Sequence, residues 1–318
     1  MRYGFNSEQD RRFPSMVQVS ITNVCDLACS MCPHTEFSRQ KGFIAQYLYM
    51  DLYKRIADET GKNGGTIRLL GWGEALLHPD LVKMVEYAKF VGAKFVTLIT
   101  NGKQLDKETS GGLIKAGLDI LEVSLDAYTE STYQAIRRNP YFHRIKENIF
   151  TFLRLRDELE GETYVAVGII KQPRVEAELE DFITYWSQIA DDVVVRRYRD
   201  FKGYVHEPIE LPATREPCRC LWARFNITPE GKVTVCYDDW QSQYIVADLN
   251  CEQTTIERIW QGEIFEQYRN AHLEGNAFGL CKDCKDWIAS SWSQPYEVLL
   301  EKVNRWKEER NVRLGKVK

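Results

Sequence analysis

The sequence lacks two features that would place the protein in a membrane or on nucleic acid. No apolar run approaches the roughly 18–20 residues that a membrane-spanning helix needs. The polar N-terminal segment, MRYGFNSEQDRRF, has no apolar core of the kind found in secretory signals. The formal net charge of −4 provides no basic field to attract nucleic acid. We therefore expect a cytoplasmic protein that binds neither a membrane nor nucleic acid.

Cysteine, by contrast, is plentiful. Nine cysteines in a chain without an export signal indicate a reducing compartment, where cysteines bind metals more often than they form disulfides. The chain has 318 residues, of which 44% are apolar, and this is enough for a substantial core. Such a length suits one large domain or two unequal ones.

Three of the cysteines follow a predicted strand directly. The alternating apolar segment 17–21 predicts that strand, and it leads into Cys25, Cys29 and Cys32. Three thiolates in one short loop can bind one face of an iron–sulfur cluster and leave one iron open to a small molecule. Disulfides would leave one cysteine over, and structural zinc would need a fourth ligand, for which only the nearby His34 is available. Three buried, unreactive thiols so close together would be a coincidence.

Strand-like and helix-like segments alternate after the triplet. Six such units predict an α/β fold with a parallel sheet. The expected strands cover 17–21, 66–70, 94–100, 120–125, 164–170 and 193–198, and the expected helices cover 48–62, 80–91, 106–116, 142–159 and 175–190.

Polar residues follow successive strands of this predicted sheet. Cys25, Glu74, Asn101 and Asp126 each come just after a strand. In α/β barrels the reactive face lies at the C-terminal ends of the strands. Each residue alone is more typical of a turn than of a ligand site. Their repetition behind a cysteine triplet favours a functional site.

A triplet in the loop after the first strand resembles the signature of radical S-adenosylmethionine (SAM) enzymes. The resemblance implies a 4Fe–4S cluster held by Cys25, Cys29 and Cys32. It also implies that SAM binds the open iron and is cleaved to methionine and a 5′-deoxyadenosyl radical, which removes a hydrogen atom from the substrate. The fold that it implies is a partial (β/α)6 barrel, which we assign to residues 1–203.

Four segments also resemble the SAM-binding motifs of that family. The Gly73-Glu74 pair resembles the end of a Gly-Gly-Glu-Pro motif that holds the SAM amino group, although Trp72 and Ala75 replace its first Gly and its Pro. Met31 stands at the loop position that meets adenine in the family, and Thr100 and Asn101 belong to a segment that resembles its Thr-Asn-Gly motif near SAM. Ser124 and Asp126 belong to a segment that resembles the one near the SAM ribose or carboxylate. The implied SAM-binding residues are Met31, Gly73, Glu74, Thr100, Asn101, Ser124 and Asp126.

A second group of cysteines occupies the C-terminal third. Alternation stops near Gly203, and 204–216 reads as a linker. A predicted β-hairpin over 225–236, a helix over 254–271 and a C-x2-C loop follow, with a charged helix over 295–313 at the end. From spacing alone, zinc and iron–sulfur are equally good interpretations of this set.

The layout resembles the Twitch half of the SPASM-type extension of radical SAM enzymes, which carries one auxiliary 4Fe–4S cluster. The resemblance implies an auxiliary-cluster domain over 204–318, with Cys220 as the alternative to the first ligand. The implied ligands are Cys218, Cys236, Cys281 and Cys284.

Cys251 belongs to neither set of implied cluster ligands and lies between the predicted hairpin and the next predicted helix. In some radical SAM epimerases a free thiol returns a hydrogen atom to the substrate radical, and we assign that catalytic role to Cys251. A packing role at the start of a helix is an equally good interpretation.

Arginines also follow the last predicted strand. Arg196, Arg197 and Arg199 could enter the barrel mouth, where guanidinium groups suit hydroxyls and carboxylates, or could form a solvated edge. Tyr128, Arg137 and His143 are further candidate substrate contacts.

The predicted function is epimerisation of an amino-sugar or other carbohydrate substrate, as in aminoglycoside antibiotic biosynthesis. The resemblance further implies a reducing partner such as flavodoxin or ferredoxin. Alternatives are a dehydrogenase that oxidises a sugar or cyclitol alcohol, a peptide-modifying radical SAM enzyme and an activase of another enzyme. An iron–sulfur or zinc-binding sensor is the alternative that is not an enzyme.

Overall fold

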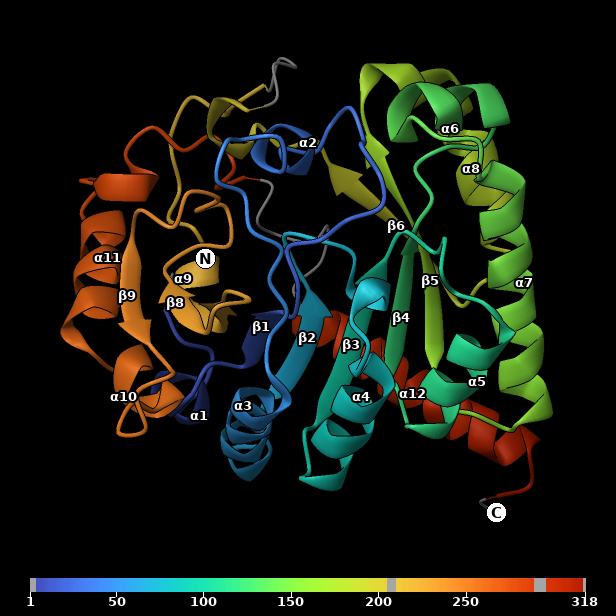
Figure 1. Cartoon of the computed structure of the whole chain (residues 1–318), viewed down its shortest axis with the longest axis horizontal. Helices are drawn as coiled ribbons and strands as arrows, with labels where there is room; N and C mark the ends of the chain where they lie inside the picture. Colours follow the sequence, from blue (N-terminus) through green and yellow to red (C-terminus); the bar gives the residue numbers. More distant parts are fainter. Residues whose placement is uncertain (1–3, 205–209, 289–295, 317–318) are drawn as a thin grey trace.

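The structure is a computed structural model that describes residues 4–204, 210–288 and 296–316. A nine-stranded sheet, with the order β6-β5-β4-β3-β2-β1-β7-β8-β9, runs through the molecule (Figure 1). The predicted α/β class is confirmed. The strands are β1 Met16–Ser20, β2 Thr66–Leu70, β3 Phe95–Thr100, β4 Ile120–Ser124, β5 Tyr164–Lys171, β6 Asp192–Arg197, β7 Arg224–Ile227, β8 Lys232–Thr234 and β9 Ile245–Asp248.

The first six strands are all parallel to their neighbours and form the curved barrel wall. Every residue of β1 is buried, and β2 to β5 are buried over nearly their whole length. Continuous apolar runs are typical of parallel strands that are covered on both faces. All six strands therefore have their C-terminal ends at the same edge of the sheet, and the predicted site residues lie at that edge.

Helices cover the outer face of this wall (Figure 1). Two of these helices begin with a side-chain cap: the side chains of Asp106 and Thr129 accept backbone hydrogen bonds at the beginning of α5 and α6. The α-helices of this part are α1 Glu8–Arg12, α2 His34–Phe37, α3 Met50–Lys62, α4 Leu81–Phe90, α5 Lys107–Lys115, α6 Glu130–Arg137, α7 Phe142–Glu158 and α8 Leu179–Trp186. In the part of the chain that the structure describes, no helix is long and apolar enough to span a membrane.

The second cysteine region continues the barrel's own sheet. Strand β7 pairs with β1 in parallel, with Val17 opposite Phe225, and β7 and β8 form the predicted hairpin. The predicted helix over 254–271 is instead two helices, because the chain turns at Gln261 and Gly262. The helices of this region are α9 Cys220–Ala223, α10 Ile256–Trp260 and α11 Glu263–Leu273.

The last helix, α12 Tyr296–Arg313, returns to the barrel. Leu299 and Val303 pack against Phe95, Ile120 and Tyr164 on β3, β4 and β5. Figure 1 shows α12 crossing beneath the lower ends of these strands. The charged helix was predicted from residue 295, which lies outside the described residues.

Candidate active site

The cysteine triplet lies in the loop between β1 and α2, at the C-terminal edge of the barrel. The loop is fixed by main-chain bonds: the Ser30 N–H donates to the Ile136 carbonyl at 2.8 Å, and the Cys32 N–H donates to the Cys29 carbonyl at 3.3 Å. His34 adds a contact of 2.8 Å between its Nε2 and the Asn23 carbonyl oxygen. The loop is therefore anchored at several points to the barrel.

Burial raises the pKa of all three thiols above the ordinary value, to about 12 for Cys32. The three also raise one another's pKa by charge repulsion, since Cys29 acts on both Cys25 and Cys32. Buried thiolates need a nearby positive charge, and metal ions supply one. This arrangement of donors fits a metal cluster better than it fits an ordinary apolar core.

Glu74 joins the ends of β2 and β3 to each other. Its side chain accepts hydrogen bonds from the Thr100 hydroxyl at 2.6 Å, from the Asn101 N–H at 2.7 Å and from the Leu76 N–H at 3.0 Å. The Asn101 amide in turn donates to Asp26 at 3.0 Å, inside the cysteine loop. The structure thus brings together three of the predicted SAM-binding residues, and it adds Asp26 from the cysteine loop.

Gly73 is required by a close approach of two backbones. A Cβ atom at this position would lie 2.3 Å from the Val24 carbonyl oxygen, so every other residue would clash. The next N–H, that of Glu74, donates to the same carbonyl at 2.8 Å. Met31, on the cysteine loop, is also buried.

Asp126 ties the end of β4 to the same loop. Its backbone has a φ of 60°, a strained conformation for an aspartate. Its carboxylate accepts the Ile170 N–H at 2.7 Å and forms an ion pair with Arg137. Arg137 also donates to the Ser124 carbonyl at 2.7 Å and to Cys29 Sγ at 3.5 Å. Ser124 and Asp126 are therefore connected to the triplet through Arg137.

Trp72, which replaces a glycine of the family motif, bridges the barrel and the C-terminal region. Its Nε1–H donates to the Tyr237 carbonyl at 2.8 Å, and its ring stacks on Trp240 with centroids 5.7 Å apart. Phe37, on α2, contacts both indole rings. All of these contacts span long sequence separations, so local patterns could not reveal them.

Replacing Trp72 with alanine should lower the free energy of unfolding by about 3–5 kcal/mol, because the buried ring leaves a cavity between the two halves. Chemical denaturation of the purified protein would measure this loss. Phe90→Ala is the matched control, since Phe90 is 83% exposed and should change stability by about 0.5 kcal/mol or less. Equal losses in the two variants would contradict the bridging role.

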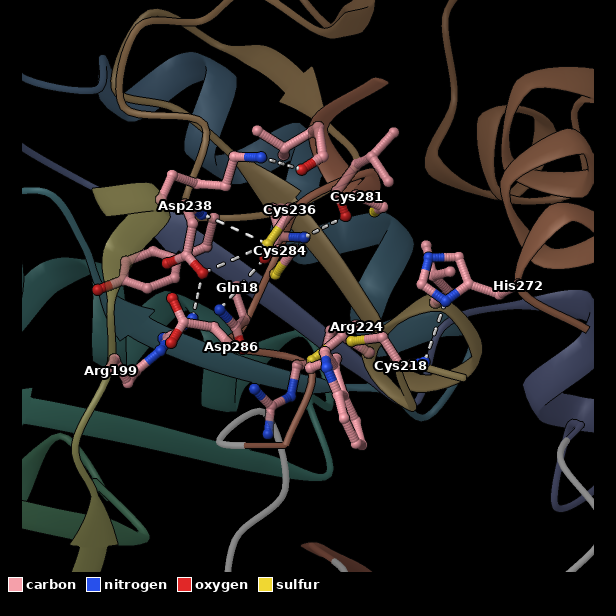
Figure 2. Close-up of a pocket in the computed structure, with 18 of the residues that line it drawn as sticks. Gln18, Arg199, Cys218, Arg224, Cys236, Asp238, His272, Cys281, Cys284 and Asp286 are labelled. Atoms are coloured by element: carbon pink, nitrogen blue, oxygen red, sulfur yellow. Dashed lines mark hydrogen bonds and ion pairs between the residues drawn. The ribbon is translucent and has the colours of Figure 1, made fainter. Parts of the chain in front are cut away.

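The second cysteine set lines a cavity of about 40 Å³. Figure 2 shows Cys236, Cys281 and Cys284 close together, with Cys218 beside His272 on the other side. Burial raises the pKa of the Cys236, Cys281 and Cys284 thiols, to about 12 for Cys281. The cysteines that line the cavity are Cys218, Cys220, Cys236, Cys281 and Cys284.

Both candidates for the first ligand thus reach the cavity. Cys220 lies near enough to raise the pKa of both Cys236 and Cys281. Cys218 is held through its N–H, which donates to His272 Nδ1 at 3.2 Å. Either thiol could complete a set of four.

Charged side chains frame this cavity. Arg199 forms an ion pair with the buried Asp238, and burial raises the Asp238 pKa to about 6, with Arg199 opposing the shift. Asp286 accepts the N–H groups of Asp200 at 2.8 Å and of Phe201 at 2.7 Å. Arg199, one of the three arginines considered for the barrel mouth or a solvated edge, lies at the second cysteine cavity.

The neighbouring arginines differ from one another. Arg196 binds buried Glu122 inside the barrel, with 2.8 Å between Nε and Oε1, whereas Arg197 is exposed. His143, on α7, is exposed and contacts Glu130. Its exposure gives no support to a substrate contact.

Cys251 is exposed and lies beside the outer side of α3. Arg55, an exposed residue of α3, donates to the carbonyl oxygens of Leu249 at 3.0 Å and of Cys251 at 3.3 Å. Cys251 is not among the described residues that line the cavities at the two cysteine groups. A thiol that returns hydrogen to a substrate radical must touch the substrate, so this position argues against the predicted catalytic role.

Sequence comparisons match both halves of the chain to known families. The radical SAM superfamily matches residues 19–183, and the SPASM iron–sulfur cluster-binding domain matches residues 218–285. The expected cofactors are therefore supported: a 4Fe–4S cluster with SAM, and auxiliary iron–sulfur binding in the C-terminal part.

Curated relatives include a probable GTP 3′,8-cyclase of Methanothermobacter thermautotrophicus. It is 34% identical over 69% of this chain and 83% of its own length. The GTP 3′,8-cyclase of Chlorobaculum tepidum is 32% identical over 41% of this chain and 38% of its own length. Molybdenum cofactor biosynthesis protein 1 of Bos taurus is 28% identical over 63% of this chain and 31% of its own length. The expected similarity to carbohydrate epimerases finds no support in these relatives.

Solved structures share the fold at low identity. SuiB of Streptococcus suis has a TM-score of 0.66 with 13% identity, covering 81% of this chain and 68% of its own. BtrN in complex with AdoMet and 2-DOIA has a TM-score of 0.57 with 17% identity, covering 87% of this chain and 95% of its own. Together with the superfamily match to 165 of 318 residues, the identity to the archaeal relative shows that the chain belongs to the radical SAM superfamily.

Proposed function

We propose that this radical SAM enzyme removes a hydrogen atom from a small polyhydroxy substrate and oxidises one of its alcohols to a ketone. The observation that carries this proposal is a polar pocket that shares its wall with the second cysteine cavity. Gln18, Asn226 and Tyr237 line both spaces.

The residues present fit the cofactors of the family. Cys25, Cys29 and Cys32 would hold the first cluster. The predicted SAM-binding residues, gathered around Glu74 and Asp126, would hold SAM. When bound, these groups supply a 5′-deoxyadenosyl radical, and an auxiliary cluster supplies a second one-electron centre. The auxiliary ligands would be Cys236, Cys281, Cys284 and one of Cys218 and Cys220.

The shared pocket lies at the ends of β1, β2 and β7 and has room for about one water molecule, so its walls would have to move apart to admit a substrate. No charged side chain is present among the described residues of its wall. Hydroxyl and amide groups alternate there with the Trp72 ring, and such groups suit the hydroxyls of an uncharged substrate. The polar side chains are Gln18, Ser20, Asn226, Thr228, Thr234 and Tyr237.

Tyr237 places this pocket between the two cysteine groups. Burial raises the pKa of its phenol, Arg199 opposes the shift, and Asp238, Cys32 of the triplet and Cys236 of the second set raise the pKa further. A substrate at Tyr237 would therefore have the SAM side of the site and the auxiliary side within reach. The backbone of Tyr237 is fixed by its bond to Trp72, so this position is rigid.

Oxidation suits this layout better than epimerisation does. An alcohol becomes a ketone when its carbon loses a hydrogen atom, its oxygen loses a proton and one further electron leaves. A second one-electron centre beside the pocket suits that last requirement, whereas epimerisation needs a hydrogen donor at the substrate. Cys251, on the outer side of α3, is not placed to be that donor.

A nucleotide substrate is the second candidate, because the curated relatives above include GTP 3′,8-cyclases. Four cationic side chains line the second cysteine cavity and could meet phosphates. Three of them already have partners: Arg199 binds Asp238, Lys202 binds the Leu280 carbonyl at 2.6 Å, and Arg215 binds the Cys281 carbonyl at 2.7 Å. Arg224 is the fourth. We therefore rank this candidate second.

The Cys251→Ala variant tests the proposal against epimerisation. Wild type and variant would be reconstituted with iron and sulfide, reduced, and given SAM with a panel of cyclitols and amino sugars in deuterated water. We expect both proteins to make the same product, two hydrogens lighter than its substrate. An isomer that carries one solvent deuterium, made by wild type but not by the variant, would instead establish Cys251 as the hydrogen donor. The reductant in the cell would be a flavodoxin or ferredoxin.

A further inference from the structure

Arg137 is a buried cation whose side chain reaches the cysteine triplet. It lies at the end of α6 and is 8% exposed. Its Nη1–H donates to Cys29 Sγ at 3.5 Å, and its Nη2–H donates to the Ser124 carbonyl at 2.7 Å. No described part of the proposed substrate pocket includes Arg137. Arg137 therefore contacts the Cys29 thiol and does not line the proposed substrate pocket.

Further contacts hold the Arg137 guanidinium in place. Asp126 forms an ion pair with it, and Asp126 is itself held by the Ile170 N–H at 2.7 Å. The neighbouring Ser30 N–H binds the Ile136 carbonyl, which ties the cysteine loop to the same helix. Arg137 and Cys29 therefore keep their relative position through two independent connections.

Arg137 places a full positive charge in direct hydrogen-bond contact with the Cys29 sulfur. Hydrogen bonds from charged donors are roughly twice as strong as those between neutral groups. The hydrogen bond from Arg137 should therefore act on the triplet through Cys29.

We propose that Arg137 is a positioning residue that raises the reduction potential of the SAM-binding cluster through its hydrogen bond to Cys29. Reduction adds one electron to the cluster and increases negative charge on its sulfurs, so a cationic N–H donor stabilises the reduced form more than the oxidised form. This inference rests on the proposed assignment of Cys29 as a cluster ligand.

The test is a redox titration of the reconstituted protein without SAM, followed by electron paramagnetic resonance of the reduced cluster. A background in which Cys281 and Cys284 are both alanine would remove the auxiliary signal. In Arg137→Gln, we expect the ratio of reduced to oxidised cluster at a fixed potential to fall about tenfold, which corresponds to about 59 mV for a one-electron couple. Arg137→Lys keeps the charge but not the forked geometry and should give a smaller shift.

Arg144→Gln is the matched control, because Arg144 is an exposed residue of the next helix, α7. It loses the same charge without losing a contact with sulfur, so its potential should stay at the wild-type value. An unchanged potential in Arg137→Gln, or an equal shift in Arg144→Gln, would overturn the proposal. If Arg137→Gln fails to retain iron, the lysine variant decides: an unchanged potential there overturns the proposal, and a lower one supports it.

Failure of this inference can be told apart from failure of the proposed function. Iron and sulfide analysis of Cys29→Ala tests the ligand assignment alone. If that variant retains the SAM-binding cluster at the wild-type level, the assignment of Cys29 is wrong. If it loses this cluster while Arg137→Gln keeps both cluster and potential, only the role of Arg137 is wrong.

Discussion

Alanine at Cys25, Cys29 or Cys32 should reduce the reductive cleavage of SAM to the level of a blank without enzyme. The three thiols occupy one anchored loop, and no other thiol of the described chain is placed there to substitute for a missing ligand. The measurement is 5′-deoxyadenosine formed under anaerobic, reducing conditions, with iron content determined on the same samples.

Cys251→Ala serves as the control for the triplet variants, since it removes an exposed thiol far from the proposed machinery. It should retain wild-type cleavage of SAM. Circular dichroism would show that the triplet variants are still folded. A folded triplet variant that cleaves SAM at the wild-type rate would contradict the cluster assignment.

Replacing Cys281 or Cys284 with alanine should stop formation of the ketone without stopping the cleavage of SAM. These residues lie in the second cysteine cavity, away from the triplet loop, so cleavage of SAM should continue. Formation of the ketone should fall toward zero, because the substrate radical then has no second centre to take its electron. The measurement is the ratio of ketone to 5′-deoxyadenosine in each reaction.

A ratio that stays at the wild-type value in these variants would show that the second cavity does not serve the reaction. Iron analysis of Cys218→Ala and Cys220→Ala belongs with the same series. Only the variant that lacks a true ligand should lose auxiliary iron, and the other should keep it.

The barrel could be predicted from the sequence because its signals are local. Strand β2 begins and ends as expected, and β3 to β6 do so to within one or two residues, since buried parallel strands form apolar runs bounded by turns. The meeting of Glu74, Thr100 and Asn101 followed from the same rule, because the C-terminal ends of neighbouring parallel strands lie side by side.

Features that depend on distant contacts could not be predicted. Periodicity predicted a helix over 295–313 but could not predict that Leu299 and Val303 pack under the barrel. No local signal placed Cys251 beside Arg55. The contact between Arg137 and Cys29 joins residues that are 108 positions apart.

The substrate is hard to predict for a related physical reason. The motifs shared across the superfamily hold the cluster and SAM, and those groups carry out a common chemistry. The proposed substrate pocket is instead lined by side chains from β1, β7 and β8, which meet only in the folded chain. Trp72 also lines this space.

The most direct test of the central claim follows one hydrogen atom. Reduced, reconstituted wild-type protein would be given SAM and candidate cyclitols deuterated at their carbinol carbons, with GTP in a parallel reaction. We expect each 5′-deoxyadenosine to carry one deuterium, and we expect a cyclitol to give ketone in an amount equal to that of 5′-deoxyadenosine. Consumption of GTP instead of every cyclitol, with transfer of hydrogen from the nucleotide, would contradict the proposed substrate class. SAM cleavage without deuterium transfer from any candidate would contradict hydrogen abstraction from this class of substrate.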